Sequence, residues 1–177
     1  YDLGFGDEIR GTILAEGVSL GIHESQSRFW ENYIGRHRSF WTYWYPILQK
    51  EYLKDLSLVP FETFLLSINR VQPSLIRVEA DEVSYPLHII LRYNLEKALV
   101  EDSLSISDLP AAWNDGMEDL LGIRPSHDGE GVLQDIHWSM GSFGYFPTYA
   151  LGTLYAAQFY FSLLKDYPQV LLEVEQG

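Results

Sequence analysis

Apolar side chains recur every three or four residues through most of this 177-residue chain, and this period favours a mostly α-helical fold. Asp81 and Asp108 each precede such a stretch as candidate caps, and Gly122 follows the second one as a candidate end. We expect one multi-helix unit over residues 1–177, without an internal boundary and with at most one or two short strands. The helices are expected at residues 20–34, 39–53, 60–69, 81–101, 109–121 and 146–165.

Some segments depart from the helical period. Residues 74–80 follow a proline and include β-branched side chains, which favours an extended stretch or a short strand. Two prolines lie inside expected helices. Because proline has no N–H group, Pro46 should kink or split its helix, and Pro86 should bend its helix. Residues 123–131 are polar and contain two glycines, so we expect a loop there.

The composition excludes several classes of function. Asp and Glu number 25 against 12 Lys and Arg, a formal charge of −13, which disfavours binding to nucleic acid or to an anionic membrane. The chain has no cysteine, so disulfides, thiolate metal sites and a cysteine nucleophile are excluded. The absence of cysteine is compatible with a cytoplasmic location.

One uncharged stretch is long enough to cross a bilayer. Residues 139–164 carry no charge, but glycines, a proline, a glutamine and scattered tyrosines make a buried helix that lines a cleft the better interpretation. The chain starts at Tyr1, and a new helical period from Pro168 runs up to Gly177. We therefore expect it to be a piece of a longer chain.

A first candidate site lies at His23-Glu24-Ser25-Gln26-Ser27. It is one residue short of the zinc motif H-E-x-x-H, because Ser27 stands where the second histidine would be. Taken alone, the pattern favours a helix surface with an ion pair between Glu24 and Arg28, one turn apart. The functional interpretation has Glu24 supply one oxygen ligand to a metal held mainly by other residues.

A second candidate is Arg77, which lies between apolar residues in Ile76-Arg77-Val78-Glu79-Ala80-Asp81. Burying an arginine is costly unless it meets an anion. That anion is either a substrate carboxylate, which guanidinium binds through two hydrogen bonds, or a structural partner among Glu79, Asp81 and Glu82. The residues alone leave both alternatives open.

A third candidate is the segment from Gly131 to Trp138, which contains Asp135 and His137 and is followed by Tyr145 and Tyr149. A neutral imidazole or a phenol can donate a hydrogen bond to an oxyanion that forms on a substrate. The alternative is a core histidine among aromatic rings. Two further histidines are predicted to have no ligand role: His88 packs on an apolar helix, and His127 is exposed in the polar loop.

These motifs together resemble one family. His23-Glu24-Ser25-Gln26, Ile76-Arg77-x-x-Ala80-Asp81 and Gly131-x-x-Gln134-Asp135-x-His137-Trp138 are similar to signatures of the M32 metallocarboxypeptidases, the thermostable carboxypeptidases of the Taq type. The resemblance covers nearly the whole chain and implies a zincin-like helical catalytic region. The family's H-E-x-x-H helix and two further upstream motifs are absent, so the resemblance implies an internal to C-terminal piece of the enzyme.

The resemblance also implies roles for individual residues. Glu24 would be the third protein ligand of a zinc or cobalt ion, while the other ligands and the general base come from the absent helix. Arg77 would bind the substrate C-terminal carboxylate, with Arg124 as the next candidate. His137 and one of Tyr145 and Tyr149 would stabilise the tetrahedral intermediate.

The remaining implications concern the whole enzyme and its alternatives. The resemblance implies peptide substrates with a free C-terminus, release of C-terminal amino acids by metal-activated water, a homodimer and a cytoplasmic location. The 177-residue piece alone is expected to be inactive. One alternative is a non-catalytic helical interaction module or pseudoenzyme, and another is an endopeptidase with related zinc chemistry.

Overall fold

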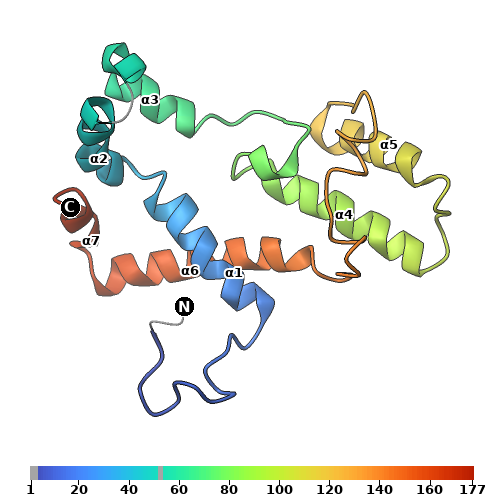
Figure 1. The fold of residues 1–177 in the computed structure, drawn as a ribbon, viewed down its shortest axis with the longest axis horizontal. Coiled ribbons are helices and arrows are strands. Elements are labelled where there is room, and N and C mark those ends of the chain that lie inside the picture. Colours follow the sequence, from blue (N-terminus) through green and yellow to red (C-terminus); the bar gives the residue numbers. More distant parts are fainter. Residues whose placement is uncertain (1–3, 52–53) are drawn as a thin grey trace. The chain divides into compact units, whose positions relative to one another are not determined.

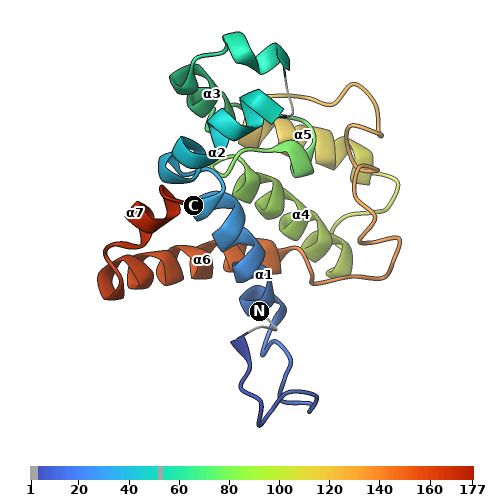
Figure 2. The same cartoon turned by 60° about the vertical axis from the view of Figure 1, so that its left-hand side comes forward.

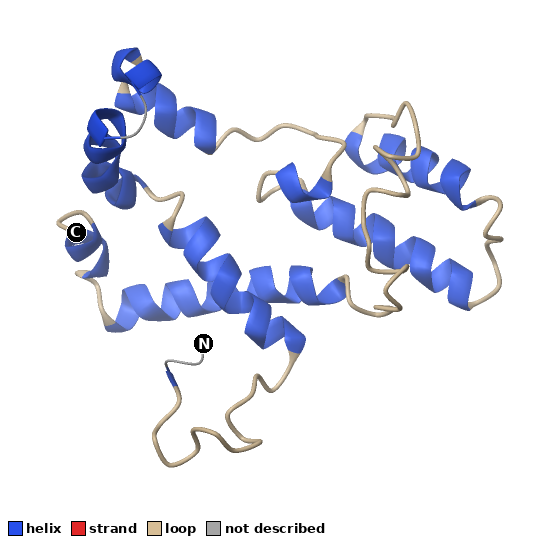
Figure 3. Cartoon of the chain, in the orientation of Figure 1, coloured by secondary structure: helices blue, strands red, loops and turns tan. Residues whose placement is uncertain are grey.

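The computed structural model describes residues 4–51 and 54–177. The chain divides into two compact units, of which the first comprises residues 1–69 and 151–177 and the second residues 70–150. All regular elements of the described residues are helices, and no strand occurs among them (Figure 3). The mostly α-helical prediction is therefore confirmed.

In the first unit, a continuous helical rod follows the turns and bends before residue 20. Helix α1 (Leu20–Arg28) starts at Ser19, whose Oγ accepts a hydrogen bond from the Ile22 N–H at 3.2 Å. The rod continues as the π-helical segment η2 (Phe29–Ile34) and ends at Gly35. Both ends agree with the prediction from the sequence, whereas the change to π-helical hydrogen bonding leaves no sequence signal.

Helix α2 (Arg38–Glu51) packs with the 3₁₀ segment η3 (Lys54–Leu58) and with helix α3 (Phe61–Ile68). Tyr45 joins them, because its ring stacks on Phe64 at 4.3 Å and its hydroxyl donates to the Val59 carbonyl at 2.9 Å. One helix contains Pro46, so the predicted split does not occur. The predicted last residue of this helix, Leu53, lies outside the described residues.

Helix α6 (Pro147–Asp166) passes from the second unit into the first, and the short helix α7 (Val170–Val174) follows it and packs on α2. Helix α1 crosses α6 where two glycines let the backbones approach (Figures 1 and 2). A Cβ added at Gly21 would lie 3.3 Å from the Cβ of Leu151, and one added at Gly152 would lie 2.8 Å from the Cγ of Glu24. No helix of the described residues is long and apolar enough to span a membrane.

The second unit is built on two antiparallel neighbours, helix α4 (Tyr85–Val100) and helix α5 (Leu109–Leu121), which lie side by side in both views (Figures 1 and 2). Their facing apolar side chains form the core of this unit. The residues of this core are Leu91, Leu95, Trp113, Met117 and Leu121. A second buried group packs where α4 begins and comprises Ala80, Tyr85, Ile89 and Phe146.

Two predictions for this unit differ from the structure. Residues 74–80 form no strand: Ile76 and Ala80 are extended, but Arg77–Glu79 between them is a 3₁₀ turn, η4. Helix α4 begins at Tyr85 and not at Asp81, because the Asp81 carboxylate accepts the N–H groups of Val83 and Ser84, both at 2.9 Å, and so closes a separate turn. Pro86 consequently lies in the first turn of α4, where proline is tolerated, and the expected bend has no cause.

Helix α5 has the predicted bounds, and Gly122 ends it with a left-handed φ of 69°. Asp108 precedes the helix as expected, but its side chain accepts a hydrogen bond from the Ser105 hydroxyl at 2.7 Å and does not cap α5. Residues 123–131 form an irregular loop that ends in turns at residues 128–131, and the loop was predicted from the polar composition.

Candidate active site

Arg77 is buried within the second unit. Its side chain is 7% exposed and donates from Nε and Nη2 to Oδ1 of Asp135, at 3.0 and 2.7 Å. Nη1 donates to the Tyr85 hydroxyl at 2.8 Å, and the guanidinium lies 5.1 Å from the centre of the Tyr149 ring. The backbone N–H of Arg77 donates to the Gln134 side chain at 2.8 Å, which fixes the position of the η4 turn.

The structural partner of Arg77 is therefore Asp135, and the alternative partners Glu79, Asp81 and Glu82 are not found. Asp81 has a different role. In addition to closing the turn before α4, it accepts the Ser84 hydroxyl at 2.8 Å and the Gln72 N–H at 2.9 Å. Although partial burial by itself raises the pKa of Asp81, these hydrogen bonds hold that pKa below its usual range.

Asp135 is bound on its other oxygen by a second arginine that the sequence motifs did not indicate. Arg92 on α4 is fully buried and donates from Nε to Oδ2 of Asp135 at 2.5 Å. Its Nη1 donates to the His88 carbonyl at 2.9 Å, and its guanidinium lies 4.5 Å from the Trp113 ring. Two arginines thus share one carboxylate.

The protonation states within this group are set by burial and by charge. Burial raises the pKa of Asp135, but the hydrogen bonds from Arg77 and the charge of Arg92 outweigh it and lower the pKa. Burial lowers the pKa of Arg92 to about 10, against the opposing effect of Asp135. At neutral pH all three groups are ionised, so together they carry a net charge of one positive unit.

His88 lies on the same face of α4, one turn before Arg92, and is fully buried. Burial lowers its pKa to about 4, and the charges of Arg92 and Arg77 add to the shift. His88 is therefore neutral at pH 7 and adds no charge to the group. Its burial agrees with the packing role predicted from the sequence, whereas His127 is 65% exposed in the loop, also as predicted.

His137 and the two tyrosines meet beside Arg77. Nε2 of His137 lies 3.2 Å from the Tyr149 hydroxyl, and the Tyr145 ring stacks on the imidazole at 5.3 Å between centres. Nδ1 of His137 lies 3.9 Å from Oδ1 of Asp135. The structure thus brings His137, Tyr145, Tyr149 and Arg77 together.

Both polar groups of this aromatic cluster keep the neutral form that can donate a hydrogen bond. Burial lowers the pKa of His137, with Asp135 opposing the shift, so the imidazole is uncharged at neutral pH. Burial raises the pKa of the Tyr149 phenol above its usual range, so the hydroxyl keeps its proton. Neutral donors with little exposed surface are suited to stabilising a developing oxyanion.

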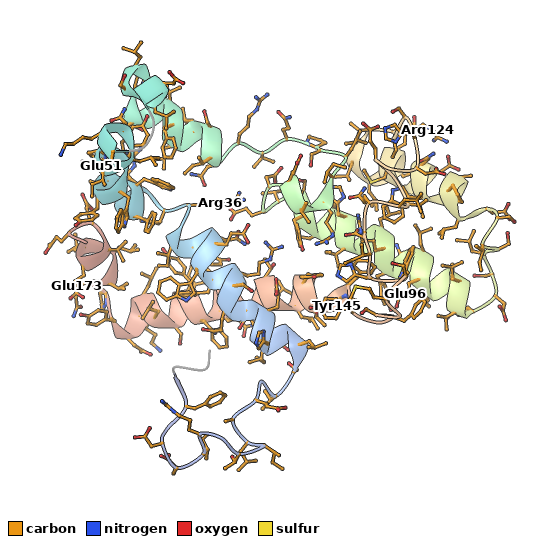
Figure 4. The ribbon with its side chains drawn as sticks, in the orientation of Figure 1. Arg36, Glu51, Glu96, Arg124, Tyr145 and Glu173 are labelled. Atoms are coloured by element: carbon orange, nitrogen blue, oxygen red, sulfur yellow. The ribbon has the colours of Figure 1, made fainter. Side chains whose placement is uncertain are left out.

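Glu96 fixes the loop that carries His137 and Tyr145, and none of the three sequence motifs includes this residue. Its carboxylate accepts the Trp138 Nε1–H at 2.7 Å and the Gly144 N–H, and Figure 4 labels it on α4 together with Tyr145. A signal did exist in the sequence, because His88, Arg92 and Glu96 recur at four-residue spacing on a helix that is mostly apolar.

Glu24 belongs to the first unit. Its side chain is 23% exposed, Oε2 accepts the Ser27 hydroxyl at 3.1 Å, and Oε1 lies 3.6 Å from Nε of Arg28. The predicted ion pair with Arg28 is therefore present. No group of three His, Cys, Asp or Glu side chains within residues 4–51 and 54–177 is arranged to hold a metal ion. Glu24 alone does not make a metal site.

Arg124, the other arginine predicted to bind substrate, lies after the C-terminal end of α5 (Figure 4). Its side chain is 47% exposed and its Nη1 is 2.8 Å from carboxylate oxygens of both Asp115 and Glu118. The hydrogen bonds that Arg124 donates to these two carboxylates raise its pKa. Arg124 thus has two anionic partners, whereas Arg77 shares a single carboxylate with a second cation.

Comparison with known proteins finds carboxypeptidases both among the family models and among the curated relatives. The family model described as carboxypeptidase Taq (M32) metallopeptidase matches residues 1–177. Carboxypeptidase 1 of Bacillus subtilis is 49% identical over 180 residues, covering 100% of this chain and 35% of that protein. Thermostable carboxypeptidase 1 of Pyrococcus furiosus is 53% identical over 168 residues, covering 95% of this chain and 34% of its own length.

Solved structures of carboxypeptidases match the fold of this chain. A Pyrococcus furiosus carboxypeptidase has a TM-score of 0.94 at 51% identity, covering 99% of this chain and 35% of that one. An M32 carboxypeptidase from Deinococcus radiodurans has a TM-score of 0.92 at 39% identity over the same shares of the two chains. The chain spans about a third of the length of the curated relatives it matches. The resemblance inferred from the three motifs is confirmed: the chain belongs to the carboxypeptidase Taq (M32) metallopeptidase family.

Proposed function

We propose that the protein containing this chain is a metal-dependent carboxypeptidase that releases C-terminal amino acids from peptides. The observation that supports the proposal best is the group formed by Arg77, Asp135 and Arg92, which keeps one positive charge beside the neutral donors His137 and Tyr149. An enzyme of this class must recognise an anionic C-terminus and stabilise an oxyanion near it. Both functions are represented among these residues.

Arg77 is the group we assign to the substrate carboxylate. Its side-chain hydrogen bonds, two to Asp135 and one to Tyr85, use three of the five N–H donors of a guanidinium. The remaining donors can bind a second carboxylate, and the bonds to Asp135 and Tyr85 hold the guanidinium in one orientation beforehand. Arg124 remains the second candidate, although its two carboxylate partners already compensate its charge.

His137 and one of the two tyrosines are the groups we assign to the oxyanion. The hydrogen-bonding distance between His137 and Tyr149 makes Tyr149 the stronger candidate, while Tyr145 supports the imidazole by stacking. A neutral donor that is already oriented loses little entropy when it meets the oxyanion. Neither group has to gain or lose a proton to act in this way.

Family membership implies a divalent metal, and we assign one of its ligands to Glu24. The described residues do not form a metal site among themselves, and we assign the further ligands and the general base to an H-E-x-x-H helix outside this chain. Zinc is the proposed ion, with cobalt as a substitute, since both accept carboxylate and imidazole ligands. Within this chain, the hydrogen bond from Ser27 and the ion pair with Arg28 orient the Glu24 carboxylate.

The other predictions for the whole enzyme are part of the same proposal. We propose that the two units belong to one catalytic domain, that the enzyme is a homodimer and that it is cytoplasmic. Its substrates are peptides with a free C-terminus. The charge of −13 makes nucleic acid an unfavourable partner.

The test uses the complete reading frame that contains this chain. The purified protein is incubated with two peptides that differ only in a free or an amidated C-terminus, before and after treatment with a chelator. We expect stepwise release of C-terminal residues from the free peptide only, loss of release with the chelator and recovery with zinc or cobalt. Cleavage inside the amidated peptide would favour an endopeptidase, and a reading frame without an H-E-x-x-H motif and without activity would favour the non-catalytic module.

A further inference from the structure

The net charge around Arg77 depends on Arg92, a residue that has no exposed surface. Arg77 and Asp135 alone would form a neutral pair, and a neutral pair attracts a second carboxylate only weakly. Arg92 adds the missing positive charge from a position with no exposed surface, behind Asp135. Its guanidinium is enclosed by the rings of Trp113 and Phe146, at 4.5 and 5.7 Å.

Apart from Asp135, no neighbouring ionisable group among the described residues forms an ion pair with Arg92. His88, one turn before Arg92, is neutral at pH 7 because burial lowers its pKa to about 4. Glu96, one turn after Arg92, bonds to Trp138 and Gly144, and no ion pair joins it to Arg92 among the described residues. The nearest histidine in the loop, His137, is also neutral.

Burying two arginines around one carboxylate costs more desolvation free energy than a single structural ion pair would. A single arginine would satisfy Asp135, whereas a second, fully buried arginine loses its hydration and lowers its own pKa to about 10. Each oxygen of Asp135 accepts hydrogen bonds from a different arginine, Oδ1 from Arg77 and Oδ2 from Arg92. The carboxylate therefore orients Arg77 without fully neutralising it.

We propose that Arg92 is a positioning residue that compensates Asp135, so that Arg77 keeps its positive charge for the carboxylate of the substrate. This inference rests on the proposed role of Arg77 in substrate binding. It adds that carboxylate recognition depends on the charge balance of three residues and not on Arg77 alone. It also assigns a binding role to Asp135, which orients the guanidinium from within the protein.

The experiment measures carboxylate recognition directly in the complete protein. The probes are an N-acetyl amino acid and its amide, which differ only in charge, and the readout is the ratio of their inhibition constants. The variants are Arg92→Gln, which removes one positive charge, and Arg92→Gln/Asp135→Asn, which removes one charge of each sign. Arg70→Gln, which removes an exposed arginine of the same unit, is the control.

We expect Arg92→Gln to reduce the preference for the carboxylate about tenfold or more, as removal of a nearby buried charge predicts. The double variant should restore the preference to within about threefold of the wild type, because its net charge is again one positive unit. The Arg70→Gln control should leave it unchanged. A structural role for Arg92 predicts no such rescue, because the double variant removes even more of the hydrogen bonds.

An unchanged preference in Arg92→Gln, or a double variant as poor as the single one, would overturn the inference while leaving the proposed function intact. A wild-type protein that does not distinguish the carboxylate from the amide would overturn the role of Arg77 and this inference with it. If Arg92→Gln does not fold, the charge-balanced double variant decides alone: a preserved preference supports the inference, and a loss of about tenfold or more contradicts it.

Discussion

Nε2 of His137 and the hydroxyl oxygen of Tyr149 lie 3.2 Å apart, and both groups are neutral at pH 7. If this pair donates to the oxyanion, Tyr149→Phe should lower kcat about 10²- to 10³-fold with little change in KM, as for the loss of one oxyanion donor. Steady-state kinetics of the complete protein measure this. Tyr145→Phe, which keeps the stacked ring, should have a smaller effect, and the reverse order would assign the role to Tyr145.

Acid should destabilise the protein through His88. Its pKa is lowered to about 4 in the folded state, so between about pH 6.5 and pH 4 the unfolded state binds more protons and stability is lost as the pH falls. This contribution is about 2 kcal/mol between about pH 7 and pH 5. His88→Leu should remove it, so the variant loses less unfolding free energy on acidification than the wild type.

Urea unfolding at about pH 7 and pH 5 measures how much unfolding free energy each variant loses on acidification, that is, the slope of stability against pH. His127→Gln is the matched control, because that histidine is 65% exposed in the loop of residues 123–131 and should leave the slope unchanged. Equal losses of stability in His88→Leu and in the wild type would show that burial of His88 is not linked to protonation.

Gly152 should be essential for the position of Glu24. A Cβ at Gly152 would lie 2.8 Å from Cγ and 2.9 Å from Cβ of Glu24, closer than carbon atoms pack. Gly152→Ala should therefore cost about 1–3 kcal/mol of stability, despite the higher helix propensity of alanine, and should reduce metal binding by the complete protein. Thermal unfolding and metal analysis check both effects.

Gly21→Ala is the matched control on the facing helix. Its Cβ would lie 3.3 Å from the Cβ of Leu151, a contact that a shift of a few tenths of an ångström relieves. We expect a stability close to that of the wild type and unchanged metal content. If Gly152→Ala binds metal as well as Gly21→Ala, Glu24 is not held at the metal by this helix crossing.

The 177-residue chain should not hydrolyse peptides by itself. Catalytic zinc sites use three protein ligands, and Glu24 is the only one we assign among the described residues. Added zinc or cobalt should therefore give no release of C-terminal residues, measured by mass spectrometry beside the complete protein as a positive control. Metal-dependent release by the chain alone would refute this assignment of ligands.

Local signals predicted much of the fold. The bounds of α5 follow from the apolar period between Asp108 and Gly122, since a glycine with a left-handed φ ends the helix. The predicted start of α4 at Asp81 was wrong because the Asp81 side chain closes a separate turn before the helix. Apolar periodicity does not show that a side chain competes with the helix for backbone N–H groups. The β-branched residues near Arg77 favoured a strand, but tertiary contacts override this local preference. The segment forms the η4 turn, which places the arginine beside Asp135.

The candidate site was only partly visible in the sequence. Arg77, His137 and the two tyrosines lie in recognisable motifs, and the structure brings them together. The role of Arg92 was missed because its partner Asp135 is 43 residues away, and nothing local indicates which buried anion a helical arginine meets. Glu96 was missed for the same reason, since Trp138 and Gly144 become its partners only in the folded loop.

The most direct test of the proposed function is the selectivity of Arg77→Lys in the complete protein. If Arg77 binds the substrate carboxylate, the loss of its paired donors should lower kcat/KM for peptides with a free C-terminus about ten- to a hundredfold. Bound metal, measured on the same sample, should change little, whereas the melting temperature should fall, because lysine cannot replace the bonds of Arg77 to Asp135 and Tyr85. A destabilised protein whose preference for free over amidated C-termini equals that of the wild type would contradict the role of Arg77 and leave Arg124 as the arginine to test next.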